Sequence, residues 1–247
     1  MRTAATSPTS ILVAVVVITA ASACVAPTET IPRAAAHWAQ CSPCHGDVGQ
    51  GDPLQRAPSI AGLPVWYVDT QLIKFRAGVR GAHFDDAAGL RMRPMALSLH
   101  SDDDVKNMSA YVAQLAMSPS KPSIAGDTAA GKTAFATCAA CHGADGGGNE
   151  ALNAPPIAGR DDWYIYDQLK KFRSGIRGTN PKDVVGPGMR AIALSLADDK
   201  ALQDVARYIA ELPPVVSVSP KLAPTDRTMP PDIETAIKGV GTETKRP

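Results

Sequence analysis

Two short runs of this chain place two thiols and one imidazole within five residues. They are CSPCH at residues 41–45 and CAACH at residues 138–142. Cysteines three positions apart lie on one helical turn, so both sulfurs can reach the two vinyl groups of one porphyrin, and the histidine that follows can bind its iron. The spacing predicts covalent attachment of a c-type haem at each run. The predicted residues are Cys41, Cys44 and His45 in the first run, and Cys138, Cys141 and His142 in the second.

Three other uses of paired cysteines explain less of this pattern. A redox dithiol belongs to a βαβ context, and no segment of the sequence reads as a strand. Two cysteine pairs can bind one zinc ion, but the 97-residue offset between the runs exceeds ordinary zinc-ligand spacing. Structural disulfides form in exported proteins. None of these alternatives gives a reason for a histidine directly after each pair.

The two runs belong to a longer internal repeat. Shifted by 97 positions, the sequence aligns with itself without a gap from about residue 34 to residue 115. WYVDTQLIKFRAGVRG in the first copy falls on WYIYDQLKKFRSGIRG in the second. The repeat predicts two domains and a short linker that is rich in Ser and Pro. Their bounds are 33–117 for the first domain, 118–127 for the linker and 128–212 for the second domain.

The repeat also selects candidates for the second axial ligand of each iron. A methionine thioether is the common choice in an electron carrier, because it favours the reduced iron. Met92 aligns with Met189, whereas the neighbouring Met95 aligns with Ile192. We therefore expect Met92 and Met189 to be the ligands, with Met95 as the alternative in the first copy. Only two of the five histidines recur in the repeat, and we expect the other three to lie at the surface.

Each copy shows the same order of elements. An apolar helix leads into the cysteine pair, and a Gly-rich loop follows it. A second helix begins near Pro64 or Asp161, with apolar residues at helical spacing. We expect a loop to carry the methionine and a last helix to follow the acidic segments SDDD and ADDK. The sequence predicts an all-α fold.

Other residues recur without a settled role. Pro58 and Pro155 stand in matching loops, where a proline can pack on the proximal histidine. A haem carries two propionates, and arginine suits carboxylate recognition. A solvated helix face explains recurring arginines equally simply, and we favour it for any single one. The arginine pairs are Arg76 and Arg173, Arg80 and Arg177, and Arg93 and Arg190.

The two ends of the chain lie outside the repeat. Arg2, the apolar run at 11–21 and the small residues after it predict a cleaved export signal over residues 1–23, although an uncleaved anchor stays open. Cys24 follows directly and is a candidate for lipidation. Residues 213–247 hold seven prolines, which predicts an extended or disordered tail, a strap or a tether.

The repeated motifs resemble tandem class I cytochrome c domains and, more closely, the dihaem cytochrome c4 family. The similarity covers residues 34–212 and includes both Cys-x-x-Cys-His runs, the P-x-I-A-G loops, and MRPMALSL and MRAIALSL before the acidic helix starts. The resemblance implies two His/Met haem domains about a pseudo-twofold axis in the periplasm. In that family the methionine lies where Met92 and Met189 stand. The tail and Cys24 depart from the family pattern, and either can tether the protein to a membrane.

We expect an electron-transfer protein rather than an enzyme. Protein ligands on both faces of each iron leave no open position for a substrate, so we expect single electrons to pass between a dehydrogenase or quinol-oxidising complex and a terminal oxidase. Two alternatives stay open: a cytochrome subunit of a larger dehydrogenase or oxidase complex, and a dihaem enzyme with one labile ligand. A nucleic-acid partner would call for a basic patch, and the formal net charge of +1 gives no sign of one. We therefore expect no nucleic-acid partner.

Overall fold

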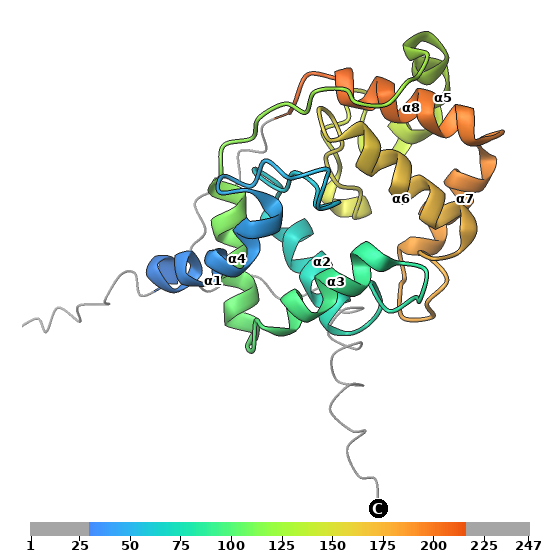
Figure 1. Cartoon of the computed structure of the whole chain (residues 1–247). Coiled ribbons are helices and arrows are strands. Elements are labelled where there is room, and N and C mark those ends of the chain that lie inside the picture. Colours follow the sequence, from blue (N-terminus) through green and yellow to red (C-terminus); the bar gives the residue numbers. More distant parts are fainter. Residues whose placement is uncertain (1–29, 216–247) are drawn as a thin grey trace, which may run out of the picture.

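The computed structural model describes residues 30–215, in which one set of helices occurs twice (Figure 1). No strand occurs within these residues, and the predicted all-α fold is confirmed. The predicted export signal, Cys24 and nearly all of the tail lie outside the described residues. The first half contains α1 Thr30–His45, α2 Val65–Arg76, α3 Ala87–Leu97 and α4 Asp102–Gln114. The second half contains α5 Thr128–His142, the 3-10 turn η1 Glu150–Leu152, α6 Asp162–Ser174, α7 Gly186–Ser195 and α8 Asp199–Glu211.

Each half folds around its own apolar core. In the first half, α4 packs on α1 and α2, and α2 packs on α3; in the second, α8 packs on α5 and α6, and α6 packs on α7. The two cores use residues 97 positions apart, which is how a gapless repeat preserves its packing. The matched pairs include Trp38 with Phe135, Leu72 with Leu169, Phe75 with Phe172, Val105 with Leu202 and Val112 with Ile209. Among the described residues, no helix is long and apolar enough to span a bilayer.

The last helix of each half starts as the acidic segments predict. The Ser101 hydroxyl accepts a hydrogen bond from the Asp104 amide at 3.0 Å, and the Asp104 carboxylate accepts one from the Ser101 amide at 3.1 Å. This reciprocal capping box satisfies two amides that the helix leaves open. At α8 only one such bond forms, from the Ala201 amide to the Asp198 carboxylate at 2.8 Å.

The expectation that a loop carries each methionine is wrong. Met92 lies within α3 and Met189 within α7. The segments around them are rich in Ala, Leu, Met and Arg, which favour helix strongly enough to outweigh the interior Pro94 of α3. Because a helix fixes the direction of its side chains, each thioether is placed by a rigid element.

Two of the ion pairs that join the halves are related to each other by a pseudo-twofold arrangement. Lys74 Nζ of α2 lies 2.7 Å from Asp183 Oδ1, and Lys171 Nζ of α6 lies 2.9 Å from Asp86 Oδ1. Each pair is the other shifted by 97 positions, with the two partners exchanged between the halves. All four side chains are largely buried, so each charge depends on its partner.

The linker lies against the second half. The Asp162 carboxylate accepts hydrogen bonds from the amides of Ser123 and Ile124, at 2.5 and 2.9 Å, and from the Ser123 hydroxyl at 2.7 Å. Arg207 Nη1 donates to the Ile124 carbonyl at 3.1 Å. These bonds hold the connecting chain in one course beside α6 and α8.

Candidate haem sites

The two predicted proximal histidines have the same surroundings. His45 and His142 end α1 and α5, and both are buried. His45 Nδ1 donates to the Pro58 carbonyl at 2.9 Å, and His142 Nδ1 donates to the Pro155 carbonyl at 2.8 Å. A carbonyl only accepts, so the proton sits on Nδ1 and the lone pair of Nε2 is left for a metal. Pro58 and Pro155 thus act on the histidines through their carbonyls.

Burial keeps both imidazoles neutral. Loss of solvent lowers the pKa of His45 and of His142, and the hydrogen bond to the proline carbonyl opposes that shift only in part. A neutral imidazole is the form that binds iron.

A glycine lets the loop after each histidine pass close to the proline loop. Gly51 has a φ of +81° and Gly148 a φ of +84°, both in the left-handed region. A Cβ on Gly51 would lie 2.4 Å from the Ser59 amide nitrogen, and one on Gly148 would lie 2.5 Å from the nitrogen of Pro156. Only glycine fits there, which explains the Gly-rich loop after each Cys-x-x-Cys-His run.

The four predicted attachment cysteines form two matched pairs with unequal exposure. Cys41 is half-buried and Cys138 is buried, whereas Cys44 and Cys141 are exposed. Burial, with a smaller contribution from the neighbouring Cys44, raises the pKa of Cys41 to about 11, and burial likewise raises that of Cys138 to about 11. None of the four forms a disulfide with another described cysteine, so each pair is available for thioether bonds.

Each predicted methionine ligand lies against the same apolar core as the first cysteine of its half. Met92 and Cys41 both pack on the first core, and Met189 and Cys138 both pack on the second. Met95 is 43% exposed, one turn further along α3. Both Met92 and Met95 line the cavity described next, so the choice between them rests on the repeat, in which only Met92 has a partner.

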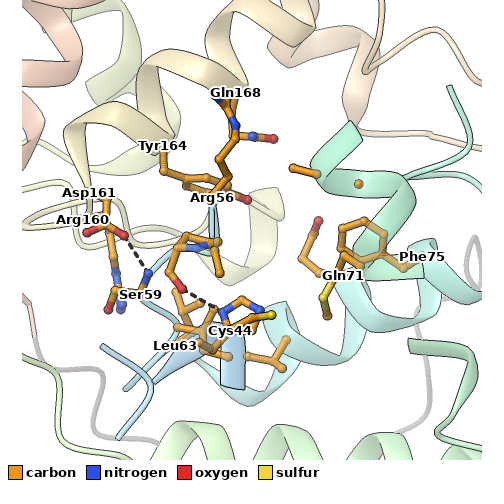
Figure 2. A pocket seen from close by; sticks show the side chains of 18 of the residues that line it. Cys44, Arg56, Ser59, Leu63, Gln71, Phe75, Arg160, Asp161, Tyr164 and Gln168 are labelled. Carbon is orange, nitrogen blue, oxygen red and sulfur yellow. Dashed lines mark hydrogen bonds between the residues drawn. The ribbon is translucent and has the colours of Figure 1, made fainter. Parts of the chain in front are cut away.

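A deep cavity of the first half is closed partly by the second half (Figure 2). Its lining includes Cys41, Cys44 and His45 together with Met92, which gathers every residue predicted to hold the first haem. The far wall comes from the second half and carries polar groups, labelled in Figure 2. These are Arg160, Asp161, Tyr164 and Gln168.

Arg80 and Arg177 place two positive charges near the pseudo-twofold axis. Arg80 donates to Gln71 at 2.7 Å and across the interface to the Tyr164 hydroxyl at 2.6 Å. Arg177 donates to Gln168 at 2.6 Å. Burial and the charge of Arg80 lower the pKa of Arg177 to about 10, which leaves it protonated at neutral pH. The preferred interpretation of a solvated helix face is therefore wrong for this pair, because both guanidinium groups are buried where the two halves meet.

The residues present fit a haem in each half. Each half offers an unprotonated imidazole nitrogen, a thioether and two thiols, which is the donor set of a His/Met c-type haem. The half-buried guanidinium groups also leave donors unused: Arg80 Nε, Arg93 Nε and Arg190 Nε are buried without a hydrogen-bond partner. Arg93 and Arg190 are a repeat pair, and such donors suit the carboxylates of haem propionates.

Some residues of this region were not predicted from the sequence. Asp161, Tyr164 and Gln168 reach the first cavity only because the two halves pack together, and the repeat alone shows no contact between halves. Asp161 does differ in type from the residue at the matching position of the first copy, which is Pro64. Of the histidines expected at the surface, His100 is exposed, whereas His37 and His83 are half-buried.

Comparisons with known proteins agree with the fold and the donor set. The cytochrome c family model matches residues 32–116 and 128–213. A thiosulfate dehydrogenase electron acceptor from Stutzerimonas stutzeri is 32% identical over 186 residues, which are 70% of this chain and 78% of that protein. The crystal structure of reduced cytochrome c4 from Pseudomonas stutzeri superposes with a TM-score of 0.58 at 26% identity, over 74% of this chain and 98% of that one.

A larger solved protein is also similar. Thiosulfate dehydrogenase (TsdBA) from Marichromatium purpuratum superposes with a TM-score of 0.61 at 30% identity, over 74% of this chain and 40% of that chain. The present chain thus matches well under half of that protein.

The fold and both sites are those of a tandem haem-binding protein. The chain belongs to the cytochrome c family, as a dihaem protein of the cytochrome c4 type. Its two domains bind two covalently attached haem c groups, and it is an electron-transfer protein.

Proposed function

We propose that this chain is a periplasmic carrier that passes single electrons through two haems of equivalent ligation. Cys41 and Cys44 hold the first haem and Cys138 and Cys141 the second. The axial ligands are His45 with Met92, and His142 with Met189. The observation that carries this proposal is the matched pair of buried histidines, each with Nδ1 bonded to a proline carbonyl and Nε2 left free.

The chain's own residues orient the ligands and exclude water. The carbonyls of Pro58 and Pro155 fix the plane of each imidazole. α3 and α7 present the thioethers, and the two apolar cores limit solvent access. When bound, haem c supplies an iron that gains or loses one electron. With both axial positions filled by protein, the residues leave no coordination site for a substrate, which supports a carrier over an enzyme.

A dehydrogenase is the proposed electron donor and a terminal oxidase the proposed acceptor. The name of the relative from Stutzerimonas stutzeri favours a thiosulfate dehydrogenase as the donor. To test this, the purified holoprotein is mixed with such an enzyme and thiosulfate in a stopped-flow spectrometer. We expect reduction of two haems per chain, followed by reoxidation when a terminal oxidase is added. Absence of reduction by the enzyme would remove the donor assignment.

A second candidate is a cytochrome subunit of a dehydrogenase, which the partial match to TsdBA favours. Co-purification of a native dehydrogenase with this chain from cell extracts would support the subunit over a diffusing carrier.

Carbon monoxide separates both of these from a dihaem enzyme with a labile ligand. We expect no carbon monoxide spectrum in the reduced wild-type protein. Met189→Ala is the positive control, because removal of the thioether opens one position. Rapid binding to one haem of the wild type would favour the enzyme.

A further inference from the structure

Asp161 belongs to the second domain but bonds to the proximal loop of the first. Its Oδ2 accepts a hydrogen bond from the Ser59 amide at 2.7 Å (Figure 2). Its Oδ1 accepts one from the Ser120 hydroxyl of the linker at 2.6 Å. Asp161 and Ser59 are both buried, so the contact is shielded from water. Although Asp161 stands at the start of α6, its carboxylate caps no amide of that helix.

The Ser59 amide shares a peptide group with the Pro58 carbonyl. That carbonyl accepts the hydrogen bond from His45 Nδ1 at 2.9 Å. One peptide unit therefore connects the Asp161 carboxylate at its N–H end to the imidazole of His45 at its C=O end. An anionic acceptor at the N–H polarises the peptide and strengthens the carbonyl as an acceptor, because hydrogen bonds in a chain reinforce one another.

The second domain lacks both the amide hydrogen and the carboxylate of this connection. His142 donates to the Pro155 carbonyl at 2.8 Å, but the next residue is Pro156, which has no amide hydrogen. Pro64 stands in the first domain at the position that aligns with Asp161, so no carboxylate is available there either. The two histidines thus make the same hydrogen bond to a proline carbonyl. Only the peptide group that binds His45 is also hydrogen-bonded to a carboxylate.

We propose that Asp161 is a positioning residue for the first haem. Through the Pro58–Ser59 peptide it makes His45 a more strongly electron-donating ligand of the iron, and it thereby lowers the reduction potential of the first haem below that of the second. The inference rests on the proposed role of His45 as an iron ligand. A stronger acceptor at Nδ1 raises the basicity of the imidazole, and a more basic ligand favours ferric iron.

The neighbouring charge of Arg160 favours this route over a simple field effect. Arg160 directly precedes Asp161 in the sequence, and its Nη1 donates to the Ala61 carbonyl in the proximal loop of the first domain at 2.9 Å. Adjacent opposite charges largely cancel at a distance, whereas the hydrogen bond from Ser59 to Asp161 is local and persists. The effect should therefore depend on the Ser59 amide hydrogen.

Ser59→Pro gives the first domain the dipeptide that the second domain already has. In a spectroelectrochemical titration of the holoprotein, we expect the lower of two one-electron potentials to rise. The expected change is at least threefold in the equilibrium constant of that haem, or about 28 mV at 59 mV per tenfold for one electron. Ser59→Ala is the matched control, because it keeps the amide hydrogen, and should leave both potentials unchanged.

Asp161→Asn tests the charged end of the connection. It should raise the same potential in the wild-type background and change it little in the Ser59→Pro background. Equal shifts in both backgrounds would show a through-space charge effect and overturn the inference, as would unchanged potentials in both single variants. If Ser59→Pro does not fold, Asp161→Asn alone still tests the proposal, because an unchanged lower potential in that variant would refute it.

A spectroscopic signature identifies the haem concerned. In the reduced, diamagnetic protein, the Nδ1 proton of each ligand histidine reports its hydrogen bond by NMR. Ser59→Pro should move the His45 resonance and leave that of His142 in place. Failure of this inference leaves His/Met spectra with potentials insensitive to Ser59. Failure of the ligand assignment is different, because the spectra would then be insensitive to replacement of Met92 and Met189.

The reverse exchange is the strongest positive test. Pro156→Ser together with Pro64→Asp supplies the second domain with an amide hydrogen and a carboxylate. We expect the higher potential to fall, which brings the two haems closer together. A fall of the lower potential instead would contradict the assignment of Asp161 to the first haem.

Discussion

The loops that support His45 and His142 are alike up to one peptide bond and then diverge. Both begin with a glycine at positive φ, and both accept the Nδ1 proton on a proline carbonyl, at 2.9 and 2.8 Å. The next residue is Ser59 in one loop and Pro156 in the other. The first hydrogen bond of each histidine is therefore set within its own domain, whereas the group behind the Pro58 carbonyl comes from the second domain.

The largest expected effect comes from removing the sulfur ligands one at a time. Met92→Ala and Met189→Ala should each abolish half of the weak charge-transfer band that ferric haem with a thioether ligand shows at the red end of the visible spectrum. Each should also lower the potential of its own haem, because the thioether favours ferrous iron. Absorption spectra and redox titrations of both variants measure this.

Met95→Ala is the matched control for the first domain. The full band should remain, since Met95 is 43% exposed and has no methionine partner in the repeat. Loss of half the band in this variant would make Met95 the ligand and break the equivalence of the two sites.

The two interface lysines should differ in their contribution to stability. Lys171 contacts Asp86 at 2.9 Å and Asp167 at 2.7 Å, whereas Lys74 contacts Asp183 at 2.7 Å. We expect Lys171→Met to lower the free energy of unfolding by about 3–5 kcal/mol, because it leaves a buried carboxylate without its cation. Lys74→Met should cost less, at about 3 kcal/mol. Urea unfolding of both variants decides this, and equal losses would mean that Asp167 adds nothing.

The ion pair between Asp86 and Lys171 should be lost only at low pH. Burial raises the pKa of Asp86, but the hydrogen bond and charge of Lys171 outweigh it, and the net pKa is lowered. A carboxylate with a lowered folded pKa stabilises the protein fully above its unfolded pKa of about 3.9, and this contribution is lost as pH falls through the folded pKa. We expect the stability of Asp86→Asn to fall less steeply than that of the wild type below about pH 4.

Unfolding of both proteins between neutral pH and pH 3 measures this difference. Parallel curves for the wild type and Asp86→Asn would show that Asp86 does not contribute to the acid response.

The smallest effect concerns the caps of the last helices. Ser101→Ala removes one side of a reciprocal capping box, and Asp198→Ala removes a single cap. We expect losses of about 1–2 kcal/mol for Ser101→Ala and about 1 kcal/mol for Asp198→Ala. Thermal unfolding can rank the two, and a larger loss for Asp198→Ala would contradict the capping-box argument.

The sequence predicted most of the fold because the gapless repeat constrains it twice. Helix starts near Pro64 and Asp161, the Gly-rich turns and the acidic caps are local signals, and the structure has them all. The methionine helices were missed because Pro94 and the glycines beside Met189 suggest a loop, although the surrounding residues favour helix.

The contacts between halves could not be predicted, because pairing within a repeat says nothing of how its copies pack. In the sequence alone, Lys74 and Lys171 are ordinary charged helix residues, and the alignment of Asp161 with Pro64 does not show which group of the first domain Asp161 contacts.

The hydrogen bonds at the start of α6 have a consequence for how far the two halves can be interchanged. Asp161 and Asp162 together secure Ser120, Ser123 and Ile124, and their counterparts in the first half are proline and valine. A chimaera made of two first halves would keep every Cys-x-x-Cys-His run yet have no acid to fasten its connecting segment. The first half therefore cannot take the place of the second without losing the contacts that hold the linker.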